Sequence, residues 1–412
     1  MRNHPSLPID ADRLWRSHEE MGQLGATPKG GVNRQALTAQ DQQARALFTQ
    51  WAQAAGCIVE TDCVGNLFAR RLARDPDLPA VCTGSHLDTQ PTGGKYDGAY
   101  GVLAGLEILR ALNDAGIETE RSIEVVAWTN EEGTRFAHSG SALFAGKADL
   151  EQAYNATDPT GIRFEDALTA IEAKGPLPLG NRPYDSLFEA HIEQGPILER
   201  EGYSVGIVTG ARSQVRYDVT VSGAEGHAGT MPMTMRQDAL TAAARLVVAL
   251  EKIGQDHPPQ GVCTVGALSV YPNSRNTIPG TVTFSIDLRH PTQDGITAMR
   301  AAIDDAMQTE QAKGKVTVCW TILDQEPPLT FDQDLVALLK AGAASLDIPV
   351  MDIFSMAGHD ACYLSQDQPT AMVFVPCKDG ISHNELESAT AEDLAAGVEV
   401  LASAILARAM QR

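Results

Sequence analysis

Three short runs of the chain are almost continuously apolar, and they constrain the fold more than any other feature. They are AVCTG at 80–84, SIEVVAWT at 122–129 and AMVFVPC at 371–377. Strands that are apolar on both faces are expected where helices cover both sides of a sheet. Helical periodicity recurs along the chain, at 39–55, 98–115, 236–253, 293–313, 332–346 and 390–410. The sequence therefore predicts an α/β fold.

The pattern changes from about residue 212. The segments 215–223, 262–271, 281–290 and 315–323 alternate apolar and polar residues, as half-exposed antiparallel strands do. Two of the expected helices lie between them, and the apolar strand pattern resumes after 330. We interpret 212–329 as an α+β domain inserted into a larger domain of 1–211 and 330–412.

The amino-acid composition limits the kinds of molecule that the protein is expected to bind. The 412-residue chain has 32 Lys and Arg against 53 Asp and Glu, a formal charge of −21, which repels nucleic acid and anionic membrane surfaces. The sequence contains no run of about 18 apolar residues, the length needed to span a bilayer. The seven Cys are scattered without C-x-x-C spacing, so neither a disulfide framework nor a thiolate zinc site is indicated. We expect a cytoplasmic protein whose partner is a small molecule, not nucleic acid or a membrane.

The stretch GSHLDTQPTGGKYDGAYG at 84–101 places ionisable side chains directly after the first apolar strand. Ligands bind at the carboxyl ends of strands in open α/β sheets. In extended chain, residues two apart point the same way, so Asp88 is placed to hydrogen-bond the second ring nitrogen of a metal-bound His86. The glycines let the chain double back and bring Asp97 to the same centre. A polar loop that merely caps a helix is the alternative for this stretch alone.

Other strand ends add further candidates. Glu131 and Glu132 follow the strand at 122–129, His191 lies in LFEAHIEQGP, and His383 follows the strand at 371–377. Adjacent carboxylates repel unless a cation or a proton intervenes, which suggests that one ligates metal and the other shuttles protons. Imidazole and carboxylate together suit zinc or its borderline neighbours, and this number of ligands suits two ions. Each His taken singly could instead be a satisfied structural residue.

These motifs together give the chain a resemblance to a known family. GSHLDT…GGKYDGAYG, WTNEEGTRF, EAHIEQGP, GHAGTMPM, NTIPG…DLRH, AGHDA and FVPCKDGISHNE follow one another in order over nearly the whole sequence. The set resembles the metallopeptidase M20 superfamily in its hydantoinase/carbamoylase branch. The resemblance implies a catalytic domain with a mixed sheet flanked by helices. It also implies an inserted lid and dimerisation domain with a four-stranded antiparallel sheet and two helices, and a homodimer.

The resemblance also assigns roles around the metals. It implies two divalent ions per subunit, with zinc expected and manganese, cobalt or nickel as alternatives. It makes Asp88 the orienter of His86 and Glu131 the general acid/base. The implied metal ligands are His86, Asp97 as the bridging residue, Glu132, His191 and His383. Exopeptidase relatives usually carry a carboxylate where His191 stands, which argues against a plain peptidase.

Substrate recognition is implied for Gln194, His227, Asn276, Arg289 and the backbone near Gly358. Arg289 suits bidentate capture of an α-carboxylate; its alternative is a surface ion pair with Asp287. In this branch His227 is supplied across the dimer to hold an oxyanion; its alternative is an ordinary loop histidine. Met356 in SMAGHDA stands where Gly is common in the family.

The expected activity is hydrolysis of the ureido C–N bond of an N-carbamoyl-L-amino acid or N-carbamoyl-β-alanine. Allantoate hydrolysis is the first alternative. A peptidase or deacylase of the same superfamily is the next, and a non-catalytic binding dimer is the last.

Overall fold

The chain folds into two units. The computed structural model describes residues 7–137, 139–180, 182–258 and 261–412. One unit comprises Met1–Thr209, Phe331–Ile353 and Gly358–Arg412, and the other comprises Gly210–Thr330 with Phe354–Ala357.

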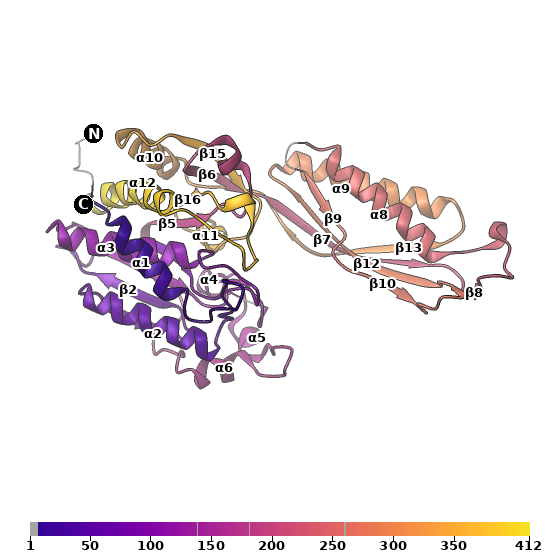
Figure 1. Cartoon of the computed structure of the whole chain (residues 1–412), viewed down its shortest axis with the longest axis horizontal. Helices are drawn as coiled ribbons and strands as arrows, with labels where there is room; N and C mark the ends of the chain where they lie inside the picture. Colours follow the sequence, from indigo (N-terminus) through magenta and orange to yellow (C-terminus); the bar gives the residue numbers. More distant parts are fainter. Residues whose placement is uncertain (1–6, 138, 181, 259–260) are drawn as a thin grey trace. The chain divides into compact units, whose positions relative to one another are not determined.

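A large mixed sheet forms the centre of the first unit (Figure 1). Its inner strands β4, β3, β5 and β16 are parallel, whereas β1 and β2 on one side and β6 on the other run antiparallel to their neighbours. In the described residues the sheet has nine strands, in the order β1 (Ile58–Thr61), β2 (Leu67–Arg71), β4 (Ile123–Trp128), β3 (Ala80–His86), β5 (Tyr184–Ile192), β16 (Thr370–Val375), β6 (Val205–Ala211) and β14 (Leu329–Thr330), with β15 (Val350–Ser355) also paired to β6.

Helices cover both faces of this sheet, as the apolar strands predict. Successive strand residues point to opposite faces. Gly105 of α3 (Ala99–Asp114) approaches Thr83 and Val125. Their neighbours Cys82 and Val126 pack on the other face, in one cluster with side chains of α4 (Gly140–Phe144) and α11 (Asp360–Leu364). The inner strands are therefore buried on both sides, and every residue of β3, β4 and β16 is buried.

Side-chain caps explain where most long helices begin. An Asp or Thr at the N-cap accepts a backbone N–H of the first turn, the usual device for satisfying that end. This holds for α1 (Ala11–Met21), α2 (Ala39–Ala54), α8 (Ala239–Gln255), α9 (Gln293–Ala312), α10 (Gln333–Ser345) and α12 (Ala391–Ala409). The shorter helices of the first unit are α5 (Leu150–Asn155), α6 (Phe164–Ala170) and α7 (Ile197–Glu201), with a 3-10 turn at Lys378–Gly380.

The second unit packs two helices on one face of an antiparallel sheet. Alternate residues of β7 and β12, such as Val219 and Phe284, form one apolar cluster with Leu246 of α8 and Met299 of α9. The sheet order is β10 (Leu268–Tyr271), β12 (Thr281–His290), β7 (Ser213–Ser222) and β13 (Thr317–Glu326), and β9 (Val262–Thr264) also pairs with β12. A small ribbon joins β8 (Gly226–His227) and β11 (Thr277–Ile278), and a 3-10 turn lies at Met233–Met235.

The sheet of the second unit differs from the expected four strands in one respect. The segment predicted as a single strand at 262–271 forms two strands, β9 and β10, both on β12. Gly266 interrupts the run between them, and glycine weakens a strand interior.

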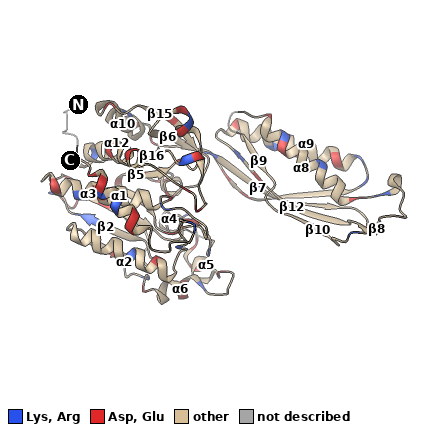
Figure 2. Cartoon of the chain, viewed as in Figure 1, with Lys and Arg blue, Asp and Glu red and all other residues tan. Residues whose placement is uncertain are grey.

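Charged residues of both signs are interspersed on the helices of both units (Figure 2). Over the described ranges, no helix combines the length and the apolar character needed to cross a membrane.

Candidate metal centre

Four parallel strands bring most of the predicted site residues to one edge of the large sheet. His86 ends β3 and is aligned with Trp128 at the end of β4, and His191 near the end of β5 is aligned with Phe374 of β16. Glu131 and Glu132 follow β4, and His383 follows β16 in sequence. Parallel neighbours place their carboxyl ends together, so residues far apart in the chain become neighbours.

The ionisable side chains form two groups that share one carboxylate. The first contains His86, Asp97 and His191, the second contains Asp97, Glu132 and His383, and the candidate ligand atoms within each group lie within 4.8 Å of one another. Asp97 faces both: its Oδ1 lies 3.2 Å from His191 Nε2 and its Oδ2 lies 3.5 Å from His383 Nε2. A carboxylate with one oxygen toward each group has the geometry of a bridging ligand.

Backbone carbonyls orient the two buried imidazoles. His86 Nδ1 lies 2.9 Å from the carbonyl oxygen of Asp88, and His191 Nδ1 lies 2.9 Å from that of Ile192. A carbonyl only accepts, so each Nδ1 carries the proton and each Nε2 presents a lone pair on the side of Asp97. Nitrogen lone pairs and carboxylate oxygens in this arrangement fit a borderline divalent cation such as zinc.

Asp88 orients His86 by a route different from the expected one. Its carboxylate Oδ1 lies 3.7 Å from His86 Nδ1, too far for a hydrogen bond, and the backbone oxygen takes that contact. The carboxylate instead accepts the backbone N–H groups of Glu131 at 3.3 Å and Glu132 at 3.2 Å. Asp88 thus links the loop after β3 to the loop after β4.

Unusual backbone conformations occur at the points of closest approach. Gly98 has φ +63°, and a Cβ there would lie 2.3 Å from the ring of His86. Gln194 (φ 58°) and His383 (φ 54°) adopt the left-handed region without being glycine. Such residues cost free energy and persist at sites where the surroundings enforce them.

Burial and charge crowding shift the pKa values of the acids. Burial, opposed by the nearby His86 and reinforced by the carboxylates of Asp360 and Glu132, holds the pKa of Glu131 well above its usual range. Burial and the charge of Asp97 raise the pKa of Glu132 to about 8. Burial alone would raise the pKa of Asp97, but the adjacent imidazoles of His191 and His86, when charged, outweigh it and lower that pKa. A cation beside Glu132 would relieve this mutual repulsion.

Sequence reasoning gave no role to two residues at the site, Gln90 and Ser382, although both lie within quoted motifs. Gln90 donates its backbone N–H to Glu132 Oε1 at 3.1 Å and its side-chain amide to Oε2 at 2.8 Å. Ser382 donates to Asp97 Oδ2 at 2.9 Å. Gln194, predicted to bind substrate, donates its amide to the same oxygen at 2.8 Å. These contacts join loops distant in sequence, which single motifs do not encode.

A third group shares His191 with the first. Glu189, His191 and His359 also come within ligand distance of one another, and all are buried. The two oxygens of Glu189 are occupied, because Oε1 accepts from Ser85 Oγ at 2.7 Å and Oε2 accepts the N–H of Ala361 at 2.8 Å. Within the group, the ring of His359 packs edge-on against that of His191, with centroids 4.6 Å apart.

The remaining predicted substrate residues are distributed over the two units. In the second unit, the backbone N–H next to His227, at Ala228, donates to the carbonyl of Asn276 at 2.9 Å. Arg289 there makes a bidentate pair with Asp287, with its Nε 2.7 Å from Oδ1, and donates to the carbonyl of Met356 at 2.8 Å. The ion pair named as an alternative is thus present. Gly358 belongs to the first unit and is exposed.

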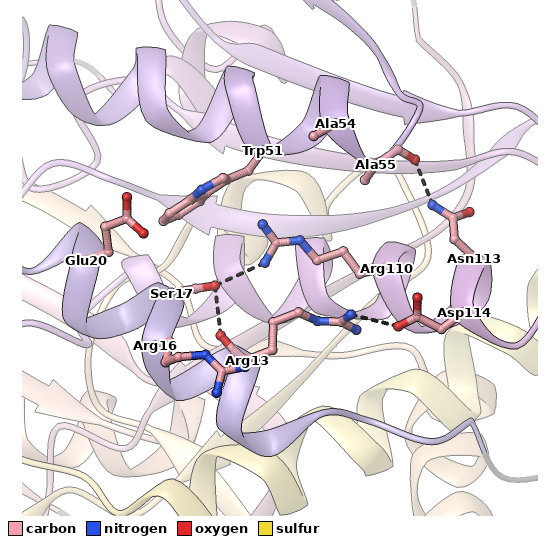
Figure 3. Close-up of a pocket in the computed structure, with 10 residues that line it drawn as sticks. All are labelled: Arg13, Arg16, Ser17, Glu20, Trp51, Ala54, Ala55, Arg110, Asn113 and Asp114. Atoms are coloured by element: carbon pink, nitrogen blue, oxygen red, sulfur yellow. Dashed lines mark hydrogen bonds and ion pairs between the residues drawn. The ribbon is translucent and has the colours of Figure 1, made fainter.

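A separate surface pocket of about 490 Å³ lies between α1, α2 and α3 (Figure 3). It contains none of the predicted site residues. Two of its three guanidinium groups are partnered locally, since Arg13 bonds Glu107 and Asp114 and Arg110 donates to Ser17.

Comparison with known proteins identifies the family. The model described as peptidase family M20/M25/M40 matches residues 82–407. The chain belongs to this metal-dependent hydrolase family. The predicted family and fold class are therefore confirmed, and so is the prediction of a hydrolase.

The relatives place the chain more narrowly. It is 43% identical over 400 residues to an N-carbamoyl-L-amino-acid amidohydrolase of Rhizobium meliloti, covering 97% of this chain and 96% of that protein. A ureidoglycolate hydrolase of Arabidopsis thaliana is 35% identical over 409 residues, covering 96% of this chain and 86% of that protein. A crystal structure of an amidase of the hydantoinase/carbamoylase family from Burkholderia multivorans has a TM-score of 0.93 at 49% identity, covering 99% of this chain and 100% of that one.

Proposed function

We propose that this protein is a dinuclear metal-dependent amidohydrolase that cleaves the ureido C–N bond of an N-carbamoyl-L-amino acid or N-carbamoyl-β-alanine. The products are the amino acid, ammonia and carbon dioxide. The observation that carries the proposal is the pair of ligand groups sharing Asp97, with Glu131 Oε2 only 3.5 Å from His86 Nε2. The similarity to N-carbamoyl-L-amino-acid amidohydrolases supports the substrate class.

His86, Asp97 and His191 would hold one ion, and Asp97, Glu132 and His383 would hold the other. Bound there, the ions would supply Lewis acidity, lowering the pKa of water and polarising the ureido carbonyl. The native ion is expected to be zinc, with manganese, cobalt and nickel as alternatives.

The proton chemistry falls to Glu131 in this proposal. Its partly buried carboxylate and raised pKa suit a group that takes a proton from the attacking water and delivers it to the leaving nitrogen. Glu132, adjacent in sequence, is held by Gln90 and serves as a ligand instead.

Substrate recognition and assembly complete the proposal. Arg289 and Asn276 would bind the substrate carboxylate, with Gln194 and the backbone at Gly358 lining the site, and His227 would hold the developing oxyanion. The unit Gly210–Thr330 would act as lid and dimerisation domain of a cytoplasmic homodimer.

The test is an ammonia-release screen with metal-reconstituted enzyme. N-carbamoyl-L-amino acids, N-carbamoyl-β-alanine and allantoate are compared with dipeptides and N-acetyl amino acids as controls, whose cleavage releases no ammonia and is therefore followed as free amino acid. Ammonia release from N-carbamoyl amino acids supports the proposal. Turnover of allantoate alone would favour the second candidate, which the ureidoglycolate hydrolase relatives keep open. Turnover of dipeptides or of no substrate by loaded enzyme would refute both.

A further inference from the structure

The loop that carries Asp97 lies directly against the loop that carries His383. Gly94 marks their closest approach, because a Cβ at that position would lie 2.0 Å from Cδ of Glu387. Only a residue without a side chain permits this distance. The glycine leaves room for the Glu387 carboxylate in the loop of Asp97.

Glu387 uses that room to hold the backbone of the shared ligand. Its Oε1 accepts the N–H of Tyr96 at 2.9 Å and the N–H of Asp97 at 3.1 Å, across 290 residues of sequence in the second case. The residue is only 6% exposed, and among the ion pairs of the described ranges it takes part in none. A carboxylate is costly to bury without a cationic partner. The two backbone contacts satisfy Oε1 and offset part of that cost, while Oε2 is buried without a hydrogen-bond partner.

We infer that Glu387 is a positioning residue, which fixes the backbone of Asp97 relative to His383 and thereby sets the spacing of the two cation positions. It lies four residues after His383 on the same loop and touches the peptide N–H of Asp97 rather than a ligand atom. It therefore acts through Asp97. The inference rests on the proposed function, because it assumes cations at the two ligand groups.

The experiment titrates metal-free protein with Co²⁺, whose visible absorption reports the ligand geometry. Wild type should bind two equivalents. In Glu387→Ala, the more weakly bound of the two Co²⁺ ions should bind about tenfold less tightly, as is usual when a residue that orients a metal ligand is lost. The visible absorption spectrum of the bound Co²⁺ should also change. Glu387→Gln should recover most of the affinity, because its amide oxygen can accept the same two N–H groups.

Two further variants separate positioning from folding. Gly94→Ala should displace the Glu387 side chain without changing its chemistry and should reproduce the loss seen with Glu387→Ala. Glu385→Gln alters a carboxylate on the same loop that pairs with Lys29, and should behave as wild type. If Glu387→Ala does not fold, Gly94→Ala and Glu387→Gln decide the question in the same titration.

The outcomes distinguish this inference from the proposed function. Wild-type Co²⁺ affinity and spectrum in Glu387→Ala and Gly94→Ala would overturn the inference, even if their melting temperatures fell. A wild-type chain that binds no Co²⁺ would refute the proposed function, and the inference would fall with it.

Discussion

The backbone N–H of Glu132 donates to the carboxylate of Asp88 over 3.2 Å. Glu131 donates to the other oxygen of the same carboxylate. One buried acid therefore positions both the candidate ligand and the candidate proton shuttle, while its own backbone carbonyl orients His86. Asp88 acts on two neighbouring loops through different atoms.

This division predicts the phenotype of Asp88→Asn. The variant amide offers one acceptor and one NH₂ donor, so one of the two N–H groups loses its partner. We expect kcat/KM to fall about 10- to 100-fold, while metal content stays near wild type because the carbonyl still orients His86. Steady-state kinetics and metal analysis check this. Loss of metal as severe as in His86→Ala would contradict it.

Substitution of each of the two adjacent glutamates should have a different effect on activity and metal content. Glu131→Gln removes the proton acceptor and should lower kcat by about 10²- to 10⁴-fold with both metal equivalents retained. Glu132→Gln should lose one equivalent. Metal content of both purified variants is the measurement. A Glu131→Gln protein that loses metal as readily as Glu132→Gln would show that the roles are wrongly divided.

Arg289→Lys tests carboxylate recognition. Lys cannot reproduce the two-point contact of a guanidinium, so we expect KM to rise about tenfold, equivalent to about 1.4 kcal/mol, with a smaller change in kcat. Arg216→Lys is the matched control, since Arg216 makes an exposed pair with Asp324 on a neighbouring strand. Equal effects of the two substitutions would argue that Arg289 only supports the fold.

The buried His18 should make the free energy of unfolding depend on pH, independently of catalysis. Burial, only partly offset by the backbone of Lys95, lowers its pKa to about 3 in the folded chain. The unfolded chain takes up this proton near pH 6.5, so stability falls as the pH drops through that value. Between pH 7.5 and 5.5 the loss from this group is about 1.4 kcal/mol.

The variant His18→Phe keeps the ring packing against Tyr96 and Tyr100 and removes the titrating group. Urea unfolding at the two pH values should therefore show a smaller loss in the variant by that amount. An identical loss in wild type and variant would mean that His18 has the same pKa in the folded and the unfolded chain.

The fold was largely predictable because its signals are local. The apolar strands at 80–84 and 122–129 became β3 and β4, and the expected helix at 98–115 became α3 at Ala99–Asp114. Helix α1 was missed. Two of its buried positions are Ser17 and His18, which hide the apolar period.

The candidate site was predictable only in part. His86 and Asp97 lie in a dense motif, and strand order explains why His191 and His383 join them. Gln90 lies in the same motif as His86, yet sequence spacing indicates neither its role nor that of Glu387. Their partners are hydrogen-bond donors and acceptors 42 and 290 residues away, and those contacts exist only after the loops have packed.

The two ligand groups differ in their access to water. His86 and His191 are each 1% exposed, whereas the side chain of His383 is 50% exposed. An ion of a different radius would be opposed by the rigid, buried side chains of His86 and His191, whereas the exposed loop of His383 could adjust to it. We therefore expect metal exchange to proceed through the His383 side, with the inner position filled first and emptied last.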